Sequence, residues 1–366
     1  MPLLYATLPE HFTISIFGAQ YHGEAPSAEK QQHIDNFVGL LSAAKYFDDV
    51  IHDDNERGLG ISRVWISYWL SPEAFAKWWT SEEVVAFWGA LPEDVGFWRE
   101  TMHFPTTRFL NEVSQEIPSG VSHLGPIVPI TEKTCYWGAY RDRILESTKE
   151  DRLASPLATV PEPRKADGTI RQGRVRMAEF PENLCYVIEG QDHTPLKEDE
   201  TRVWSSKFHW LAKRWVTNIM RAGPEGGVLS ARMMYAPENG RMKVEPSDLS
   251  DDPDILPQLE MNRKIELLYF LDMSYMERAG RKDKVHVDLR DDFIKTYGPG
   301  GIMSHGDLLM WVELGILKSQ SIEAEYIGCY EGTGFLAYDH HPEFKSNKDQ
   351  PGGKGFISGV LKYLGM

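Results

Sequence analysis

One histidine in the last third of the chain has the surroundings that suggest the most definite chemistry. His286 ends the polar, basic run MERAGRKDKVH (276–286), and the strand-like LLMWVELGIL (308–317) follows after a glycine-rich turn. We expect His286 to lie where a short helix meets an apolar pocket, with residues 308–317 as the opposite wall. A neutral imidazole there is a suitable axial ligand for haem iron. A histidine at a helix end is, however, also commonly a capping or surface residue.

Several other kinds of chemistry are disfavoured by missing motifs. The sequence contains no GxxxxGK[ST], GxSxG, HExxH or strand-linked GxGxxG motif, which argues against nucleotide hydrolysis, α/β-hydrolase chemistry and zincin proteolysis. The three cysteines, Cys135, Cys185 and Cys329, form neither CxxC nor CxxCH. This spacing excludes the usual structural zinc site and a covalent c-type haem, and it is typical of a reducing compartment.

Composition limits the class of partner. The 366 residues include 39 Lys and Arg and 54 Asp and Glu, which gives a formal net charge of −15. Such an acidic chain lacks the positive charge needed to neutralise phosphates, so we expect no nucleic acid and no anionic membrane as partner. The N-terminal MPLLYATLPEHF has no basic or long apolar region, and no later run approaches a membrane span. The sequence therefore predicts a cytoplasmic protein.

The elements that must position His286 follow a pattern that occurs twice. Residues 63–70 (RVWISYWL) favour a strand, and Ser71 with Pro72 supplies an N-cap and first-turn proline for a helix. Residues 265–271 (IELLYFL) favour another strand, and Asp272 or Ser274 can cap a helix that Gly280 ends. The chain is therefore expected to contain two related strand-helix halves.

Strand candidates outnumber helices and do not alternate with them regularly. The further candidates are residues 134–141, 183–190, 227–236, 308–317 and 324–332. This order favours an α+β fold with an antiparallel, barrel-like sheet and helices outside it. The Pro-, Gly- and charge-rich stretches 156–174 and 236–258 are interpreted as loops, and the tail after Phe344 as a mobile segment with a possible final helix.

Taken together, several segments resemble the haem-containing aldoxime dehydratase (phenylacetaldoxime dehydratase) family. They are YWGAYRDR (136–143), NLCYVIEGQD (183–192), MERAGRKDKVH, YIGCYEGTGFL (326–336), YWLSPEAFAKWW and GFWRE. The resemblance implies two ferredoxin-like halves of the dimeric α+β barrel type, divided as residues 1–125 and 126–366 of one haem-binding domain (1–366). It also implies a homodimer that binds haem b and dehydrates an aldoxime to a nitrile at ferrous iron.

The resemblance assigns roles to two residues that match the family pattern. The proximal iron ligand falls on His286 and the distal arginine on Arg143. A guanidinium near haem can orient a substrate or pair with a propionate. The alternative for Arg143 is a surface position in a charged run with Arg141 and Asp142.

Two positions depart from the family pattern. Glu189 stands where the family has a serine that bonds the aldoxime oxygen, and Val312 stands where it has its distal histidine. Valine cannot transfer a proton. Strand alternation turns Glu313 away from the face of Val312, so Glu313 is not expected to replace the missing acid.

Two other residues are candidates for the missing acid. Glu189 shares a strand face with Cys185 and Val187, and a carboxyl in an apolar pocket would have a raised pKa and could act as the acid. The alternative is a solvated glutamate at a strand end. His305 could reach the pocket from the glycine-rich loop, or could be an exposed loop residue.

Three functional hypotheses remain from this reasoning. The first is a haem-dependent aldoxime dehydratase that uses Glu189 or water in place of the histidine. The second is a haem enzyme of the same fold with altered chemistry at an N–O or N–N bond. The third is a non-catalytic haem-binding sensor or degenerate relative.

Overall fold

The computed structural model describes residues 3–130, 140–243 and 254–347. In these ranges the chain forms two successive β-α-β-β-α-β units, in which each α position holds one helix or two. The first unit comprises β2 (His11–Gln20), α1 (Ala28–Leu41), β3 (Tyr46–Asp53), β4 (Ile61–Trp69), α2 (Pro72–Trp79), α3 (Glu82–Ala90) and β5 (Phe97–Pro105). The second comprises β9 (Leu184–Asp192), α4 (Glu198–Lys207), α5 (His209–Met220), β10 (Val228–Tyr235), β11 (Arg263–Phe270), α6 (Met273–Lys282), α7 (Lys284–Tyr297) and β12 (Leu309–Leu317).

Both units have the same strand order. In the sheet the first unit reads β5-β2-β4-β3 and the second reads β12-β9-β11-β10, so each has the order 4-1-3-2 counted along its own strands. This is the ferredoxin-like arrangement. The predicted α+β fold with an antiparallel sheet is confirmed. The division predicted near residue 125 stays a prediction, and the two units lie on either side of it.

Six shorter or later strands extend the two units. β13 (Ile322–Tyr330), β8 (Ile170–Glu179) and β14 (Lys345–Asn347) continue the sheet beyond β5, and β6 (Phe109–Val113), β1 (Leu4–Ala6) and β7 (Ile127–Pro129) continue it beyond β12. The described part thus contains one antiparallel 14-stranded sheet in the order β14-β8-β13-β5-β2-β4-β3-β10-β11-β9-β12-β6-β1-β7.

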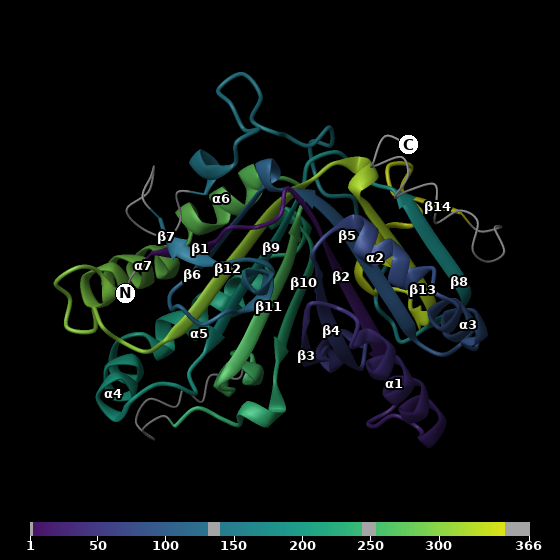
Figure 1. Cartoon of the computed structure of the whole chain (residues 1–366), viewed down its shortest axis with the longest axis horizontal. Helices are drawn as coiled ribbons and strands as arrows, with labels where there is room; N and C mark the ends of the chain where they lie inside the picture. Colours follow the sequence, from purple (N-terminus) through teal and green to yellow (C-terminus); the bar gives the residue numbers. More distant parts are fainter. Residues whose placement is uncertain (1–2, 131–139, 244–253, 348–366) are drawn as a thin grey trace.

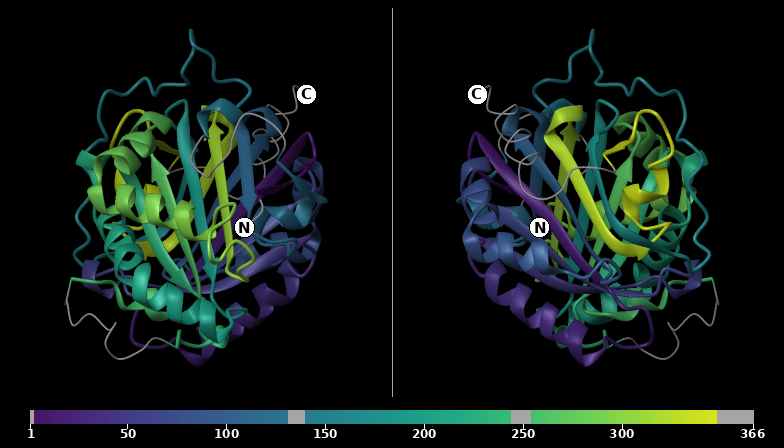
Figure 2. Two further views of the ribbon diagram at one scale, coloured as in Figure 1. Left: turned by 90° about the vertical axis from the view of Figure 1, so that its left-hand side faces the viewer. Right: turned by 90° about the vertical axis from the view of Figure 1, so that its right-hand side faces the viewer.

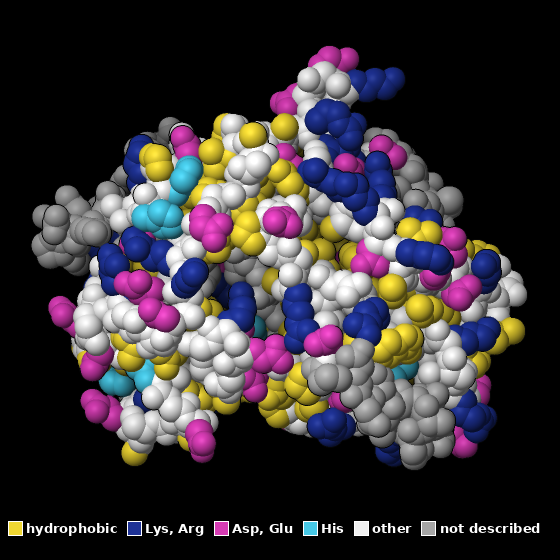
Figure 3. All heavy atoms as spheres, turned by 180° about the vertical axis from the view of Figure 1, so that it is seen from behind, with side chains coloured by type: hydrophobic (Ala, Val, Ile, Leu, Met, Phe, Trp, Pro, Cys, Tyr) yellow, Lys and Arg dark blue, Asp and Glu magenta, His cyan; other side chains and the backbone are white. Residues whose placement is uncertain are grey.

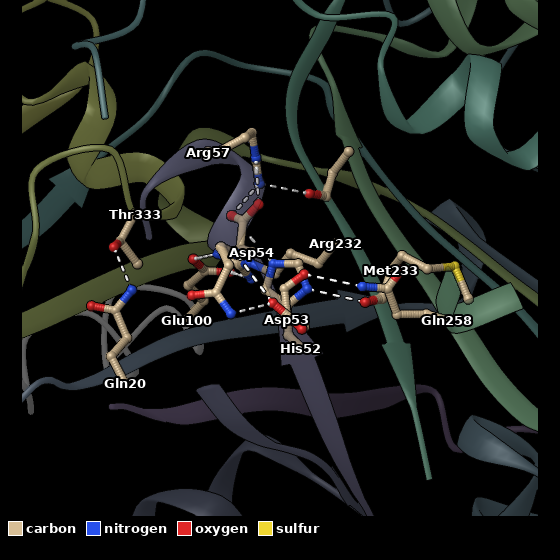
Figure 4. Close-up of polar contacts among 12 residues, drawn as sticks. Gln20, His52, Asp53, Asp54, Arg57, Glu100, Arg232, Met233, Gln258 and Thr333 are labelled. Atoms are coloured by element: carbon tan, nitrogen blue, oxygen red, sulfur yellow. Dashed lines mark hydrogen bonds and ion pairs between the residues drawn. The ribbon is translucent and has the colours of Figure 1, made fainter. Parts of the chain in front are cut away.

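The two units meet where β3 lies beside β10. Their backbone pairing is short, with Met234 opposite His52 and Tyr235 opposite Ile51. Polar side chains reinforce the junction (Figure 4): the His52 Nδ1 lies 3.0 Å from the Met233 carbonyl oxygen. Arg232 of β10 donates two hydrogen bonds to Glu100 of β5, at 2.5 and 2.8 Å. Because the Arg232 and Glu100 side chains are buried, this bidentate pair fixes the orientation of the two units.

Helices cover the outer faces of the sheet, and the inner faces share one core. Figure 1 shows α1 to α3 on one side of the strands and α4 to α7 on the other, and the left view of Figure 2 shows the second helix layer in front of the sheet. The shared core contains residues of both units, among them Phe12, Ile66, Tyr186 and Tyr269. This core, enclosed by the two halves of the curved sheet, gives the molecule its predicted barrel-like character.

The two helix layers differ in how they are filled. Beneath α1 to α3 the space is packed with large aromatic rings: Phe17, Phe37, Trp65, Trp69, Phe75, Trp78, Trp79 and Trp88. Beneath α4 to α7 the apolar packing is interrupted by a cavity. The first unit is therefore filled by aromatic packing, whereas the second unit holds the candidate site.

Most predicted elements near the site occur with small changes at their ends. Ser71 caps α2 by accepting a hydrogen bond from the Ala74 N–H at 3.2 Å, as expected. Helix α6 starts after Asp272 as predicted but continues past Gly280 to Lys282, because a single glycine is tolerated inside a helix. The loop expected at 156–174 gives way to β8 at Ile170.

Two further predictions fall on residues that the structure describes only in part. The strand predicted at 134–141 lies mostly outside the described residues, and Arg141 begins a short 3₁₀ turn. The final helix predicted in the tail lies outside them altogether.

The distribution of surface charge and the apolar character of the helices are relevant to the partners expected from the sequence. Acidic and basic side chains are intermixed over the back of the molecule (Figure 3). Of the helices in the described ranges, none has the length and apolar character needed to cross a membrane.

Candidate functional site

A cavity of about 260 Å³ lies between the sheet of the second unit and the helices that cover it. Strands β9, β11 and β12 form its floor, and α5, α6 and α7 form its roof. Its aromatic lining consists of Tyr140, Trp204, Trp215, Phe270, Phe293 and Trp311. Titratable side chains at two opposite walls distinguish this cavity from a simple packing defect. They are a histidine from the helices and two glutamates from the sheet.

His286 lies in the first turn of α7 and lines the cavity. Asp283 caps this helix, because its Oδ1 accepts hydrogen bonds from the Val285 N–H (2.8 Å) and the His286 N–H (3.3 Å). The cap fixes the backbone from which the imidazole projects. The expectation that His286 ends a short helix changes accordingly: α6 ends at Lys282, and His286 begins the next helix.

The tautomer of His286 follows from its hydrogen bond. Its Nδ1 lies 2.5 Å from the Gly280 carbonyl oxygen, which can only accept, so Nδ1 carries the hydrogen. The lone pair is therefore on Nε2, the atom that a metal can bind, and the carbonyl holds the ring in place. Burial lowers the pKa of His286, which favours the neutral ligand form.

Two neighbours shape the space around this imidazole. A side chain at position 280 would place its Cβ 3.2 Å from His286 Cε1, so glycine permits the close approach of α6 and α7. The ring of Trp215 from α5 lies 4.4 Å from the imidazole, centroid to centroid, at an interplanar angle of 40°. A neutral imidazole with a free Nε2, in an aromatic and aliphatic cavity, fits the axial ligand of a haem.

The opposite wall carries a row of residues at matching positions of neighbouring strands. Glu266 of β11 lies directly across from Glu189 of β9, and Glu189 lies across from Val312 of β12. Val312 in turn lies across from Glu112 of β6. Directly opposed residues in a sheet point to the same face, so the row presents three carboxyls and one valine towards the helix layer. Glu266, Glu189 and Val312 line the cavity.

Burial shifts the acidity of these carboxyls. Glu189 is enclosed by protein but borders the cavity, and burial raises its pKa to about 7. Burial, and then the nearby Glu189, raise the pKa of Glu266 well above its usual range. Burial also raises the pKa of Glu112 to about 7 although Arg143 opposes this. Around neutral pH the row therefore holds protons that ordinary surface glutamates would have lost.

Arg143 lies beside this row. It ends the 3₁₀ turn Arg141–Arg143, donates through Nη1 to Glu112, and donates through Nη2 to the Asn111 carbonyl at 3.1 Å. Among the described residues that line the cavity, Arg143 does not occur. The structure thus places Arg143 next to the Val312 position, in an ion pair with Glu112, and not in an exposed charged run.

Two alternative acids are located away from the cavity wall. Glu313 points into the shared core, as predicted, where it accepts hydrogen bonds from the Tyr68 hydroxyl (2.9 Å), the Tyr186 hydroxyl (3.1 Å) and the Val121 N–H (2.8 Å). His305 is exposed in the loop before β12 and is not among the described lining residues. The structure therefore agrees with the interpretation of His305 as an exposed loop residue.

Sequence reasoning missed Glu266 and Trp215. Glu266 stands in the strand IELLYFL, which was correctly expected, and a single charged residue in an otherwise apolar strand was an available signal. Trp215 belongs to α5, a helix that was not predicted, and its approach to His286 depends on how α5 packs on α7.

Comparison with known proteins gives a consistent result. The model of a family described as haem-containing dehydratase matches residues 15–335. A phenylacetaldoxime dehydratase from Bacillus sp. (strain OxB-1) is 25% identical over 342 residues, which cover 91% of this chain and 90% of that protein.

Solved structures share the fold. An aldoxime dehydratase crystallised with butyraldoxime has a TM-score of 0.70 at 17% identity, with 92% of this chain and 88% of that one covered. Another aldoxime dehydratase has a TM-score of 0.69 at 20% identity, with 92% and 91% covered.

Proposed function

Because the chain belongs to the haem-containing dehydratase family, we propose that it is a haem b enzyme that dehydrates an aldoxime to a nitrile in the cavity beside His286. The observation that carries the proposal is the pairing of two opposed walls. A histidine with a free Nε2 projects from the helices, and carboxyls that hold protons near neutral pH project from the sheet. Haem-dependent dehydration of an aldoxime requires a ligand for the iron and a proton donor on opposite sides of one cavity.

His286 would hold the cofactor through Nε2. When bound, ferrous haem supplies an iron that coordinates the aldoxime nitrogen and donates electron density to the N–O bond. Trp215 and Phe293 offer apolar surface to the macrocycle, and Arg281 and Arg290 offer guanidinium groups for its propionates.

Glu189 would supply the proton for the departing hydroxyl. Its carboxyl borders the cavity directly across from Val312, the position at which the family resemblance expects a histidine. A protonated carboxyl gives its proton to the hydroxyl oxygen as the N–O bond breaks, and water leaves. A pKa near the working pH suits this step, because a large fraction of the carboxyl is then protonated and the group is still acidic enough to release the proton.

The test uses the full-length protein loaded with haem and reduced with dithionite. Phenylacetaldoxime and an aliphatic aldoxime are added anaerobically, and the nitriles are measured by gas chromatography. We expect nitrile from the reduced wild type and none from His286→Ala. No nitrile from either substrate would refute the proposal.

A second candidate function rests on the same departure from the family pattern. Glu189 and Val312 replace the expected serine and histidine, which favours a different substrate with an N–O or N–N bond. Hydroxamates, N-hydroxyguanidines and hydrazones can be offered to the reduced protein under the same conditions. Turnover of one of these without nitrile from aldoximes would favour this second function.

The assembly is proposed by analogy to be a homodimer in the cytoplasm, with one haem-binding domain per chain. The support is the resemblance to a dimeric α+β barrel family, together with the acidic composition. Sedimentation velocity of the haem-loaded protein tests the oligomeric state. A sedimentation coefficient of a monomer at micromolar concentration would contradict it.

A further inference from the structure

Two carboxyls, and not one, border the cavity from the sheet side. Glu189 of β9 and Glu266 of β11 are directly opposed in neighbouring strands, and both line the cavity. Directly opposed residues have their Cβ atoms about 5 Å apart, so both side chains can approach one substrate from adjacent positions. Glu266 is 2% exposed, and Glu189 is half-buried.

Electrostatics prevents both groups from being charged at once. Two carboxylates at this separation repel each other strongly when both are buried, so the pair retains one proton between them. Titration then belongs to the pair and not to either residue alone. At neutral pH the cavity wall thus contains one proton donor and one proton acceptor.

A buried lysine accompanies the pair. Lys264 lies two residues before Glu266 on the same face of β11, and its Nζ donates to the Met261 carbonyl at 3.0 Å and contacts the Met242 sulfur at 3.2 Å. The charged groups that act on its Nζ come from four elements. They are Glu266 of β11, Glu260 of the preceding 3₁₀ turn, Asp192 of β9 and Lys213 of α5. Burial lowers the pKa of Lys264 to about 7. When the lysine is charged, it favours an ionised carboxyl at Glu266 and leaves the shared proton on Glu189.

We propose that Glu266 is a second catalytic residue, the base that removes the proton from the aldoxime carbon while Glu189 protonates the leaving hydroxyl. This inference rests on the proposed dehydratase function. The C–H bond breaks towards Glu266, its electron pair becomes the third C–N bond, and the N–O bond breaks as the hydroxyl takes the proton of Glu189. Afterwards the proton on Glu266 passes to Glu189 and restores the pair, so no external proton or oxidant is consumed.

The third carboxyl of the row is not equivalent to these two. Glu112 lies on the far side of Val312, is committed to Arg143, and is absent from the described lining of the cavity. Glu266 is therefore the candidate base, because it is the neighbour of Glu189 that borders the same cavity.

Kinetic isotope effects distinguish the two roles. An aldoxime with deuterium on the reacting carbon is given to the haem-loaded wild type, Glu266→Gln and Glu189→Gln. Both variants should lose about a hundredfold or more in kcat, as for loss of a general acid or base. Only Glu266→Gln should show a larger deuterium isotope effect, because removal of the proton from the aldoxime carbon becomes rate-limiting. Glu266→Asp should recover part of kcat. Wild-type kcat in Glu266→Gln, or an unchanged isotope effect, would overturn the proposal.

Infrared spectroscopy tests the pair without any turnover. In the haem-loaded protein, the C=O band of a protonated carboxyl is followed as pH is varied. We expect Glu266→Gln to move the midpoint of Glu189 to lower pH, because the repulsion is lost, and Lys264→Met to move the titration of the pair to higher pH. Glu313→Gln is the matched control, since it removes a buried carboxyl on the opposite face and should leave the midpoint of the pair unchanged.

The infrared experiment and the nitrile assay distinguish failure of the role proposed for Glu266 from failure of the proposed dehydratase function. An unchanged midpoint in Glu266→Gln would show that the carboxyls do not form a pair, and would overturn the role of Glu266 even if nitrile is formed. A shifted midpoint with no nitrile from the wild type would refute the dehydratase reaction, and with it the catalytic role, while leaving the shared proton established.

Discussion

Val312 of β12 and Glu189 of β9 face each other directly across two hydrogen-bonded strands. The position where the family resemblance expects the distal histidine is therefore apolar but borders a carboxyl of raised pKa. An acid on the neighbouring strand reaches the same cavity because cross-strand neighbours project to one face. A carboxyl that can hold a proton near neutral pH thus borders this apolar position, so proton transfer at this wall is chemically feasible.

His286→Ala should abolish stoichiometric haem binding. The Nε2 lone pair is the one histidine ligand that the cavity offers within the described residues, and alanine removes it while leaving the fold of α7 intact. Absorption spectra after haem titration measure the Soret band, and added imidazole should restore part of it. His305→Ala is the control, because His305 is exposed and lies outside the cavity lining, and it should bind haem as the wild type does. An unchanged spectrum in His286→Ala would refute the assignment.

Much of the site's framework was predictable from local patterns. The alternation in residues 308–317 correctly separated Val312 from Glu313, because side chains on a strand point alternately to two faces. The strand 183–190 placed Glu189 with Cys185 and Val187 for the same reason. Local periodicity thus sufficed to assign the faces of each strand.

The pairing of strands was beyond local patterns. Glu266 is opposite Glu189, and Glu112 is opposite Val312, only because of the order of strands in the sheet. Those contacts join residues far apart in the sequence. The ion pair of Arg143 with Glu112 is hidden from the sequence for the same reason, so the residues alone left a site role and a surface position both open for Arg143.

Val312→His should increase any weak dehydratase turnover. A histidine at this position would stand between Glu189 and Glu112, whose carboxyls stabilise an imidazolium and so favour its role as proton donor. We expect a several-fold rise in kcat with phenylacetaldoxime, and no rise in Val312→Leu, which keeps the wall apolar. Equal turnover in both variants would argue that the acid does not act from this strand position.

The pH dependence of turnover should follow the carboxyl pair. Glu189 donates only when protonated, and its pKa is raised to about 7 by burial. The rate should therefore decline about tenfold per pH unit as pH rises well above 7, and it should also fall at lower pH, where both carboxyls of the pair are protonated. Initial rates of the reduced protein from pH 5.5 to 9 measure this. A rate that rises through pH 7 would contradict an acid role for Glu189.

Arg143→Met should destabilise the fold. Arg143 is the cation paired with the buried Glu112, and its removal leaves that carboxyl without its partner. Removing one partner of a buried ion pair commonly costs about 3–5 kcal/mol. Urea unfolding measures the change, and the double variant Arg143→Met/Glu112→Gln should regain much of the loss because no buried charge remains. Equal destabilisation in the single and double variants would show that the arginine acts by packing alone.

Glu313→Gln should change how stability depends on pH. Burial raises the pKa of Glu313 from its ordinary 4.5 to about 8, despite hydrogen bonds from two tyrosine hydroxyls and one N–H that oppose the rise. Between these values the unfolded chain ionises Glu313 while the folded protein retains its proton. The free energy of unfolding contributed by this group therefore falls as pH rises, by about 1.4 kcal/mol per pH unit. The glutamine variant lacks that loss, so its stability relative to the wild type should increase from pH 5 to pH 8 in urea unfolding. Parallel pH profiles of the two proteins would show that Glu313 is already ionised in the folded core.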